Sequence, residues 1–285
     1  MIKMENIEIF PGSKILVKGN VPSSSIVLIG PPGVGKTTFC KQFLFNGLVI
    51  NEPCIYVTTQ ESPEEIEKSM KAFGFDVKPY VDNKLLRIVD GCSWKTGVVS
   101  SSEYSIDGQQ NYLTSIWIKV KKAQQDLKNY RLVIDSVSEI TAMNNPKAVL
   151  NFLQILTARI RSDESKAIFT LAYGAHDEQF MNILRLIFDG IFEMKIDESK
   201  KEILRLLRIF SLKGAKHHTT WTPFEITDKG LILKRETESR CTLCSKLIDW
   251  DPIAKVIAEK ECYFDTEECL KTYRKFKSVY GDNFE

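Results

Sequence analysis

A glycine-rich segment with a single lysine carries the clearest chemical signal in the sequence. Residues 30–37 read GPPGVGKT and match the pattern G-x-x-x-x-G-K-[ST]. Glycines let a backbone curl until several N–H groups point at one phosphate, and a following helix adds its N-terminal dipole. The segment therefore predicts a phosphate-binding loop. The residues expected to contact phosphate are Gly30, Pro31, Pro32, Gly33, Val34, Gly35, Lys36, Thr37 and Thr38.

Two side chains of this segment have predicted roles of their own. Lys36 would reach the β and γ phosphates of a nucleoside triphosphate, and Thr37 would ligate Mg²⁺ through its hydroxyl. Lys36 also opens an expected helix, where a cation is unfavourable unless an anion is bound nearby. A Gly/Pro-rich turn that matches by chance is the alternative. The strand expected before the segment and the helix expected after it argue against that alternative.

An acid follows a later apolar run. Residues 132–136 read LVIDS, so Asp135 comes at the end of an expected strand. In open α/β sheets ligands bind at the carboxyl ends of the strands, which would place this carboxylate beside the phosphate site. Asp135 is therefore predicted to hold the Mg²⁺ ion, through water. The alternative is that Asp135 only caps the next turn.

The elements that would position these residues alternate along the chain. Strands are expected at residues 25–29, 54–59, 85–89, 131–135 and 167–171, and helices at 36–46, 63–73, 109–129, 146–161 and 179–188. This alternation is typical of an α/β fold with a mostly parallel sheet and helices on both faces. Later strand-like runs, which have no helices between them, predict antiparallel edge strands at 190–196, 203–212, 224–226 and 231–233.

Length and composition favour a large domain followed by a small one. The 285 residues are 43% apolar and 27% charged, with a net charge of +2, which gives no support for nucleic-acid binding. No apolar run reaches about 18 residues and the start lacks a secretory signal, so we expect a cytoplasmic protein without a membrane span. The expected boundaries are a first domain at 1–235, a polar linker at 236–240 and a second domain at 241–285.

Four of the seven cysteines fall within the last 45 residues. Cys241 and Cys244 form a C-x₂-C pair, and Cys262 and Cys269 follow. Thiolates at this spacing on a tight turn can bind a tetrahedral Zn²⁺ ion. A domain this short has a small core, so a bound metal would add needed stability. A disulfide is the alternative, and the odd cysteine count and reducing compartment disfavour it.

The fourth zinc ligand is open between two residues. One predicted tetrad is Cys241, Cys244, Asp265 and Cys269, and the other uses Cys262 in place of Asp265. Asp265 also has a structural interpretation, because with Glu268 it would form a capping box for the last helix. The segment 261–276 resembles small treble-clef zinc fingers of the TRASH and MYM type, in which a cysteine occupies the position of Asp265.

Three segments of the larger domain resemble the KaiC-like branch of the RecA superfamily of ATPases. They read GPPGVGKTTF at 30–39, YVTTQESPEEI at 56–66 and SLKGAKHHTTWTPFEITDKGL at 211–231. The resemblance spans roughly residues 5–235. It implies a RecA-like P-loop core that binds ATP and Mg²⁺ and assembles into homo-oligomers.

The same resemblance implies a catalytic glutamate at Glu61, which would orient and deprotonate the attacking water. The family often has two adjacent acids at this point, and here the first is Gln60, which can orient water but cannot accept its proton. The alternative role for Glu61 is to complement the dipole of the helix that begins at Pro63.

The resemblance also implies that cations of a late strand reach the γ-phosphate bound by a neighbouring subunit. The family pattern Lys-x-Arg-Gly is Ser-x-Lys-Gly here, so Ser211 replaces one cation and Lys213 is the remaining catalytic candidate. Strand alternation predicts that Arg208 lies on the opposite face from Lys213. His176, which follows the strand at 167–171, is a further candidate sensor of the γ-phosphate, with a structural loop histidine as the alternative.

These observations favour a cytoplasmic, Mg²⁺-dependent ATPase whose nucleotide state controls assembly or partner binding. Three alternatives stay open: a non-hydrolysing nucleotide-bound adaptor, a DNA recombination or repair ATPase, and a KaiC-like autokinase with Thr219, Thr220 or nearby serines as acceptors. The net charge of the C-terminal finger is negative, which favours a protein partner over nucleic acid. The expected ligands are ATP, Mg²⁺ and Zn²⁺.

Overall fold

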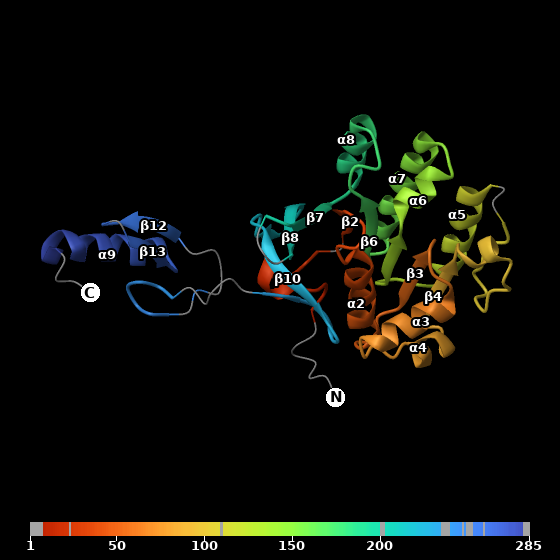
Figure 1. The fold of residues 1–285 in the computed structure, drawn as a ribbon, viewed down its shortest axis with the longest axis horizontal. Helices are drawn as coiled ribbons and strands as arrows, with labels where there is room; N and C mark the ends of the chain where they lie inside the picture. The colour runs from red at the N-terminus through yellow and green to blue at the C-terminus, as the bar shows by residue number, and fades with distance from the viewer. Residues whose placement is uncertain are drawn as a thin grey trace. The chain divides into compact units, whose positions relative to one another are not determined.

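The computed structural model divides the chain into two compact units, residues 1–234 and residues 235–285 (Figure 1). The structure describes residues 8–22, 24–108, 111–199, 203–234, 240–246, 248, 253–258 and 260–281. Most of the linker expected at 236–240 lies outside these described residues. Among the described residues, no helix has both the length and the apolar character needed to cross a bilayer.

A nine-stranded sheet forms the centre of the larger unit, in the order β11-β10-β8-β7-β2-β6-β5-β3-β4. Six strands are mutually parallel: β2 (Ser25–Gly30), β3 (Cys54–Thr58), β4 (Leu86–Asp90), β5 (Arg131–Asp135), β6 (Lys166–Ala172) and β7 (Gly190–Asp197). Three antiparallel strands extend one edge: β8 (Leu204–Leu212), β10 (Thr222–Thr227) and β11 (Gly230–Leu233). The predicted α/β class with antiparallel edge strands is confirmed. A separate short ladder joins β1 (Val17–Lys18) to β9 (Lys216–His217).

Helices cover both faces of the sheet because the strands are apolar on both sides. Ile26 and Leu28 of β2 belong to one buried core, and Val27 and Ile29 belong to the other. The first core includes residues of α1 (Ser13–Leu16), α2 (Lys36–Leu48) and α3 (Pro63–Ala72), with α4 (Lys78–Asp82) packed against it. The second includes residues of α5 (Tyr112–Ala123), α6 (Val137–Ala142), α7 (Pro146–Ser162) and α8 (Glu178–Ile187) (Figure 1).

Local sequence signals explain where several helices begin and end. Ser62 caps α3 in a capping box with Glu65, and Pro63 takes the first helical position. The helix expected over 109–129 is shorter than predicted, because α5 ends at Ala123. Asp126 and Asn129 adopt left-handed backbone conformations that a continuing helix cannot accommodate.

A β-bulge in β8 changes which of its side chains share a face. The register of β8 against β7 shifts at Phe210, so Ile209 pairs with Phe192 and Ser211 pairs with Ile191. Leu207, Ile209 and Leu212 all lie in the first core as a result. The prediction that Arg208 and Lys213 lie on opposite faces is therefore wrong, because the extra residue restores the same parity to both.

Within its described residues, the smaller unit has one hairpin and one helix. Strand β12 (Ile253–Ile257) pairs with β13 (Lys260–Phe264) in antiparallel register, and α9 (Glu267–Tyr280) follows. Its buried core consists of Cys241, Cys262, Phe264, Leu270 and Tyr273. Such a core is small for an independent folding unit.

Candidate nucleotide site and cysteine cluster

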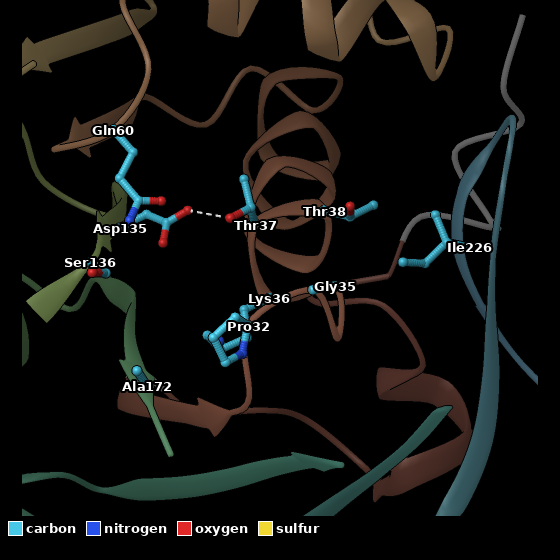
Figure 2. Close-up of a pocket in the computed structure, with 11 residues that line it drawn as sticks. Pro32, Gly35, Lys36, Thr37, Thr38, Gln60, Asp135, Ser136, Ala172 and Ile226 are labelled. Carbon is cyan, nitrogen blue, oxygen red and sulfur yellow. Dashed lines mark hydrogen bonds between the residues drawn. The ribbon is translucent and has the colours of Figure 1, made fainter. Parts of the chain in front are cut away.

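A cavity of about 380 Å³ opens at the carboxyl edge of the sheet, where α2 begins (Figure 2). Its size falls within the range of small-molecule sites. Figure 2 shows Gln60, Asp135 and Ser136 on one side of the phosphate loop, and Thr38 and Ile226 on the other. The lining residues are Pro32, Gly33, Gly35, Lys36, Thr37, Thr38, Gln60, Asp135, Ser136, Ala172 and Ile226.

The remaining loop residues predicted to contact phosphate do not line this cavity. Gly30 and Pro31 offer backbone carbonyls to Lys36. Val34 is fully buried in the first core, where it anchors the loop. The structure thus gathers six of the nine predicted loop residues around the cavity, together with Asp135.

The glycines give the loop its shape. Gly33 has φ +74° and Gly35 has φ +114°, both in the region that disfavours side chains. Gly35 is also the N-cap of α2, and a Cβ there would lie 2.7 Å from Cδ1 of Ile226. At its N-cap, α2 therefore presents backbone without a side chain to the cavity, beside the side chains of its first residues.

Lys36 is a half-buried cation without a carboxylate partner among the described residues. Its Nζ donates to the carbonyl oxygens of Gly30 at 2.7 Å and Pro31 at 2.9 Å. Burial lowers the pKa of Lys36, and the negative charge of Asp135 partly opposes that effect. A cation held only by carbonyl groups beside a helix N-terminus fits a phosphate chain.

Asp135 and Thr37 meet across the cavity, as Figure 2 shows. Thr37 Oγ1 donates to Asp135 Oδ2 at 2.8 Å, and Thr170 Oγ1 donates to Oδ1 at 2.6 Å. Hydroxyl and carboxylate oxygens are the donors that Mg²⁺ prefers, so this pair fits a magnesium site. The alternative that Asp135 caps the next helix is wrong, since Ser136 is the N-cap of α6.

Tyr56 supports the Asp135 carboxylate from β3. Its hydroxyl donates to Asp135 Oδ2 at 3.3 Å, and the side chain is almost fully buried. Burial, followed by the charge of Asp135, raises the pKa of Tyr56 well above its ordinary value. The tyrosine therefore stays protonated and remains a donor.

Gln60 and Glu61 point to different partners. Gln60 lines the cavity, whereas the Glu61 carboxylate accepts from Lys41 Nζ, which lies 2.8 Å from Oε1 and 2.6 Å from Oε2. Ser69 Oγ of α3 also donates to Glu61 Oε1, at 3.2 Å. The acid predicted to be catalytic is thus part of an ion pair with α2.

A second lysine–glutamate pair lies near the same edge of the sheet. Lys95, from the 3₁₀ helix η2 (Ser93–Thr96), contacts Glu139 of α6 and donates to Thr59 O at 2.7 Å. Thr59 Oγ1 donates to Glu139 Oε2 at 2.7 Å and receives a hydrogen bond from Ser136 N at 3.0 Å. This network ties the segment after β4 to the end of β5.

The predicted late-strand cation does not line the cavity. Lys213 Nζ donates to Phe188 O at 3.2 Å, and its side chain is 65% exposed. Its role toward a neighbouring subunit stays a prediction. Arg208 forms an ion pair with Glu193 at 2.5 Å and stacks on Trp221, so its guanidinium is already engaged within the unit.

His176 does not line the cavity, and Ser138 lies between it and the lining residue Ala172. Its Nε2 is 2.9 Å from Ser138 Oγ, and the ring stacks on Phe180. Ser138 Oγ in turn accepts from the backbone of Ala172, which does line the cavity. Burial lowers the pKa of His176. These contacts fit the structural interpretation of this histidine and leave a sensing role as a prediction.

The smaller unit brings four predicted zinc ligands together. One ligand atom from each of Cys241, Cys244, Asp265 and Cys269 lies within 4.8 Å of the others. Asp265 Oδ1 is buried from solvent and has no hydrogen-bond partner among the described residues. Three thiols and an orphaned carboxylate oxygen form a donor set that fits Zn²⁺.

The structure also places the alternative ligand and the residues at the start of the last helix. Cys262, the alternative ligand, lies on β13 in the small core, and its Sγ contacts Lys260 O at 3.7 Å. The expectation that Asp265 caps the last helix is wrong, because Thr266 is the N-cap and accepts from Cys269 N at 3.1 Å. Asp265 is therefore not engaged as a cap.

Sequence reasoning missed several residues that support the nucleotide site without lining its cavity. Lys41 and Thr170 match no motif, and Tyr56 lies in the segment at 56–66, where nothing marked it as a partner of Asp135. Helical spacing offered one signal, since Lys41 follows Thr37 by four residues on α2 and so shares its face. Ile226 lies within the segment at 211–231, but nothing in that segment indicated contact with Gly35.

The chain resembles known proteins over most of its length. A family model described as the KaiC ATPase matches residues 10–238. A UPF0273 protein of Pyrococcus horikoshii is 33% identical over 232 residues, covering 78% of this chain and 91% of that protein. A UPF0273 protein of Thermotoga maritima is 30% identical over 225 residues, covering 78% and 93%.

A solved structure supports the same fold. The crystal structure of a KaiC-like protein from Pyrococcus horikoshii OT3 aligns with a TM-score of 0.62 at 24% identity, covering 79% of this chain and 96% of the other. Together with the cavity at the phosphate loop, the family match over residues 10–238 leads to one conclusion: the chain belongs to the KaiC family of ATPases.

Proposed function

We propose that the chain binds ATP with Mg²⁺ at the start of α2 and hydrolyses it, and that nucleotide state controls assembly or partner binding. The observation that carries this proposal is the placement of Lys36 beside the Thr37–Asp135 pair. Lys36 would hold the β and γ phosphates, while Thr37 and Asp135 would hold the metal. Bound Mg²⁺ would neutralise charge that develops on the phosphates.

Binding is tested by calorimetry with MgATP and MgGTP on the full chain. We expect Lys36→Ala to weaken MgATP binding by about 100-fold or more, because a charged partner of the phosphates is lost. Lys147→Ala is the matched control, since Lys147 is exposed at the start of α7. Equal affinity of Lys36→Ala and the wild type would exclude the proposed site. Size measurement by light scattering with and without nucleotide tests the control of assembly.

A second candidate function is a nucleotide-bound adaptor that does not hydrolyse ATP. The Glu61–Lys41 ion pair favours it, because the one acid implied as a base is already engaged. Gln60, which lines the cavity, can orient water but cannot accept its proton. Single-turnover hydrolysis of bound ATP distinguishes the two functions, since an adaptor would return ATP intact.

For the smaller unit we propose one zinc ion held by Cys241, Cys244, Asp265 and Cys269, and a role in docking a protein partner. Support for the metal comes from the convergence of the four ligand atoms and the orphaned Asp265 oxygen. Metal analysis of the purified chain should find one zinc per chain. A chain purified in reducing buffer without zinc or another bound metal would contradict the proposal.

A further inference from the structure

Lys41 is a buried cation on α2, the helix whose first residues line the nucleotide site. Its side chain is only 4% exposed, and it lies on α2 one helical turn after Thr37. Burial of an ammonium group is costly unless an anion and hydrogen-bond acceptors compensate it. A group that compensates the charge of Lys41 is held by it and is not free to act in the nucleotide site.

Glu61 and Ser69 compensate it. Lys41 Nζ lies 2.8 Å from Glu61 Oε1, 2.6 Å from Oε2 and 2.6 Å from Ser69 Oγ. Both carboxylate oxygens thus contact the same cation. A hydrogen bond from Ser69 Oγ to Oε1 is the third polar contact of the carboxylate. The arrangement joins α2, α3 and the end of β3 through one carboxylate.

The backbone of Glu61 is held as firmly as its side chain. Glu61 N donates to Thr58 Oγ1 at 3.1 Å, and Thr58 Oγ1 donates to Glu61 O at 2.9 Å. Ser62 then begins α3 with its capping box. Both the backbone and the carboxylate of Glu61 are thus held in place. The carboxylate cannot turn toward the cavity unless its largely buried ion pair with Lys41 breaks, and breaking such a pair is strongly unfavourable.

The other lysine–glutamate pair at this edge is built differently. Lys95 comes from the segment after β4, and its side chain is 28% exposed, against 4% for Lys41. Lys95 can be solvated when its pair opens, whereas Lys41 has no other carboxylate partner among the described residues and would be left unpaired in the interior. Of these two pairs, the one with Lys41 therefore costs more to open.

We infer that Lys41 is a positioning residue that holds Glu61 away from bound nucleotide and so keeps ATP hydrolysis slow. The inference rests on the proposed function, because it concerns the lifetime of ATP in that cavity. With Glu61 held, Gln60 is the polar side chain at this position, and it can only orient water. The chain would then keep its ATP long enough for the bound state to act as a signal.

The test measures single-turnover ATP hydrolysis and MgATP affinity on the full chain. We expect Lys41→Met to raise the hydrolysis rate by about 100- to 10,000-fold, the span expected when a general base becomes available. MgATP affinity should change less than about threefold, because Lys41 does not line the cavity. Lys41→Arg, which keeps the cation, should retain the slow rate.

The double variant Lys41→Met/Glu61→Gln shows whether the gain passes through Glu61. We expect it to hydrolyse ATP at the wild-type rate or more slowly, although Lys41 is absent. Lys78→Met is the matched control, because Lys78 pairs with Glu67 and Asp82 at an exposed site. Its rate should equal that of the wild type.

The outcomes separate this inference from the proposed function. If the wild type and Lys41→Met both bind MgATP but hydrolyse it at the same rate, the role of Lys41 is wrong and nucleotide binding stands. A double variant as fast as Lys41→Met would also overturn it. If the wild type does not bind MgATP, the proposed function fails. Lys41→Gln replaces Lys41→Met if the latter does not fold, and the same outcomes apply.

Discussion

The two candidate ligand sites of the chain are supported in different ways. Thr37 and Asp135 project from a helix and a strand that are packed into two large cores, and the carboxylate has its hydrogen-bond partners before any ligand binds. The described part of the smaller unit, which holds the cysteine cluster, has five buried core residues, and Asp265 Oδ1 has no hydrogen-bond partner there. The nucleotide site is therefore held by the packed unit around it before any ligand binds. The cysteine cluster, in a unit with a small core, is expected to need its metal for stability.

Zinc removal is the strongest test of this contrast. We expect chelation, or the variant Cys241→Ser, to unfold the smaller unit, because structural zinc sites contribute about 10–16 kcal/mol of apparent binding free energy. Hydrogen exchange should rise across β13 and α9 and stay unchanged in β2 and β5. Cys262→Ser is the control and should keep one zinc per chain. Unchanged exchange in α9 after metal loss would refute the dependence of this unit on zinc.

Two glycines of the phosphate loop test how strictly the backbone of the nucleotide site requires glycine. Gly35→Ala should destabilise the larger unit by about 2–3 kcal/mol, because φ +114° lies outside the left-handed region that Ala tolerates. Gly33→Ala should cost only about 1 kcal/mol, since φ +74° is close to that region and no atom lies within 4 Å of the new Cβ. Urea unfolding measures both, and equal losses would contradict the prediction.

Asp135→Asn tests the metal half of the nucleotide site. We compare ATP affinity with Mg²⁺ to ATP affinity without it. The ratio of the two should fall by about 10- to 100-fold in the variant, as for other residues that support a metal from its outer shell. Calorimetry with and without Mg²⁺ measures the ratio. Asp90→Asn is the control, because Asp90 is another buried acid, at the end of β4, and does not line the cavity. A wild-type ratio in Asp135→Asn would exclude Asp135 from the metal site.

His176 should produce the smallest effect, on the pH dependence of stability. Burial lowers its pKa in the folded state, so the unfolded chain binds a proton more readily. Stability should therefore be lost as the pH falls through the ordinary value of 6.5, and be unaffected by this residue above it. Urea unfolding at about pH 7.5 and 5.5 should show a smaller loss for His176→Gln than for the wild type. Equal losses would show that His176 does not cause the pH dependence.

The order of the elements and the phosphate loop could be predicted from the sequence, because both depend on local patterns. Apolar runs on both sides of a strand indicate a buried parallel sheet, and a glycine-rich turn before a helix indicates a phosphate site. Helix caps were less predictable. Asp135 and Asp265 were each plausible caps, and in both cases the next residue, Ser136 or Thr266, is the cap instead.

Contacts between distant segments could not be predicted in the same way. Simple alternation placed Arg208 opposite Lys213, and one extra residue at Phe210 changed that parity. No local pattern marked Lys41 as the partner of Glu61, because the two are joined only when α2 packs beside the end of β3. Ile226 meets Gly35 for a similar reason, across the edge strands.

The sequence by itself determined that a curled loop opens a helix at the edge of a parallel sheet, and that four sulfur or oxygen ligands are available near the C-terminus. Backbone propensities and hydrophobic periods act over a few residues, so they can be recognised without a fold. Tertiary structure alone decided which carboxylate faces the cavity, which is neutralised by a buried lysine, and which oxygen is left for a metal. Burial and charge pairing depend on neighbours that are remote in sequence, and these exist only after the chain has packed.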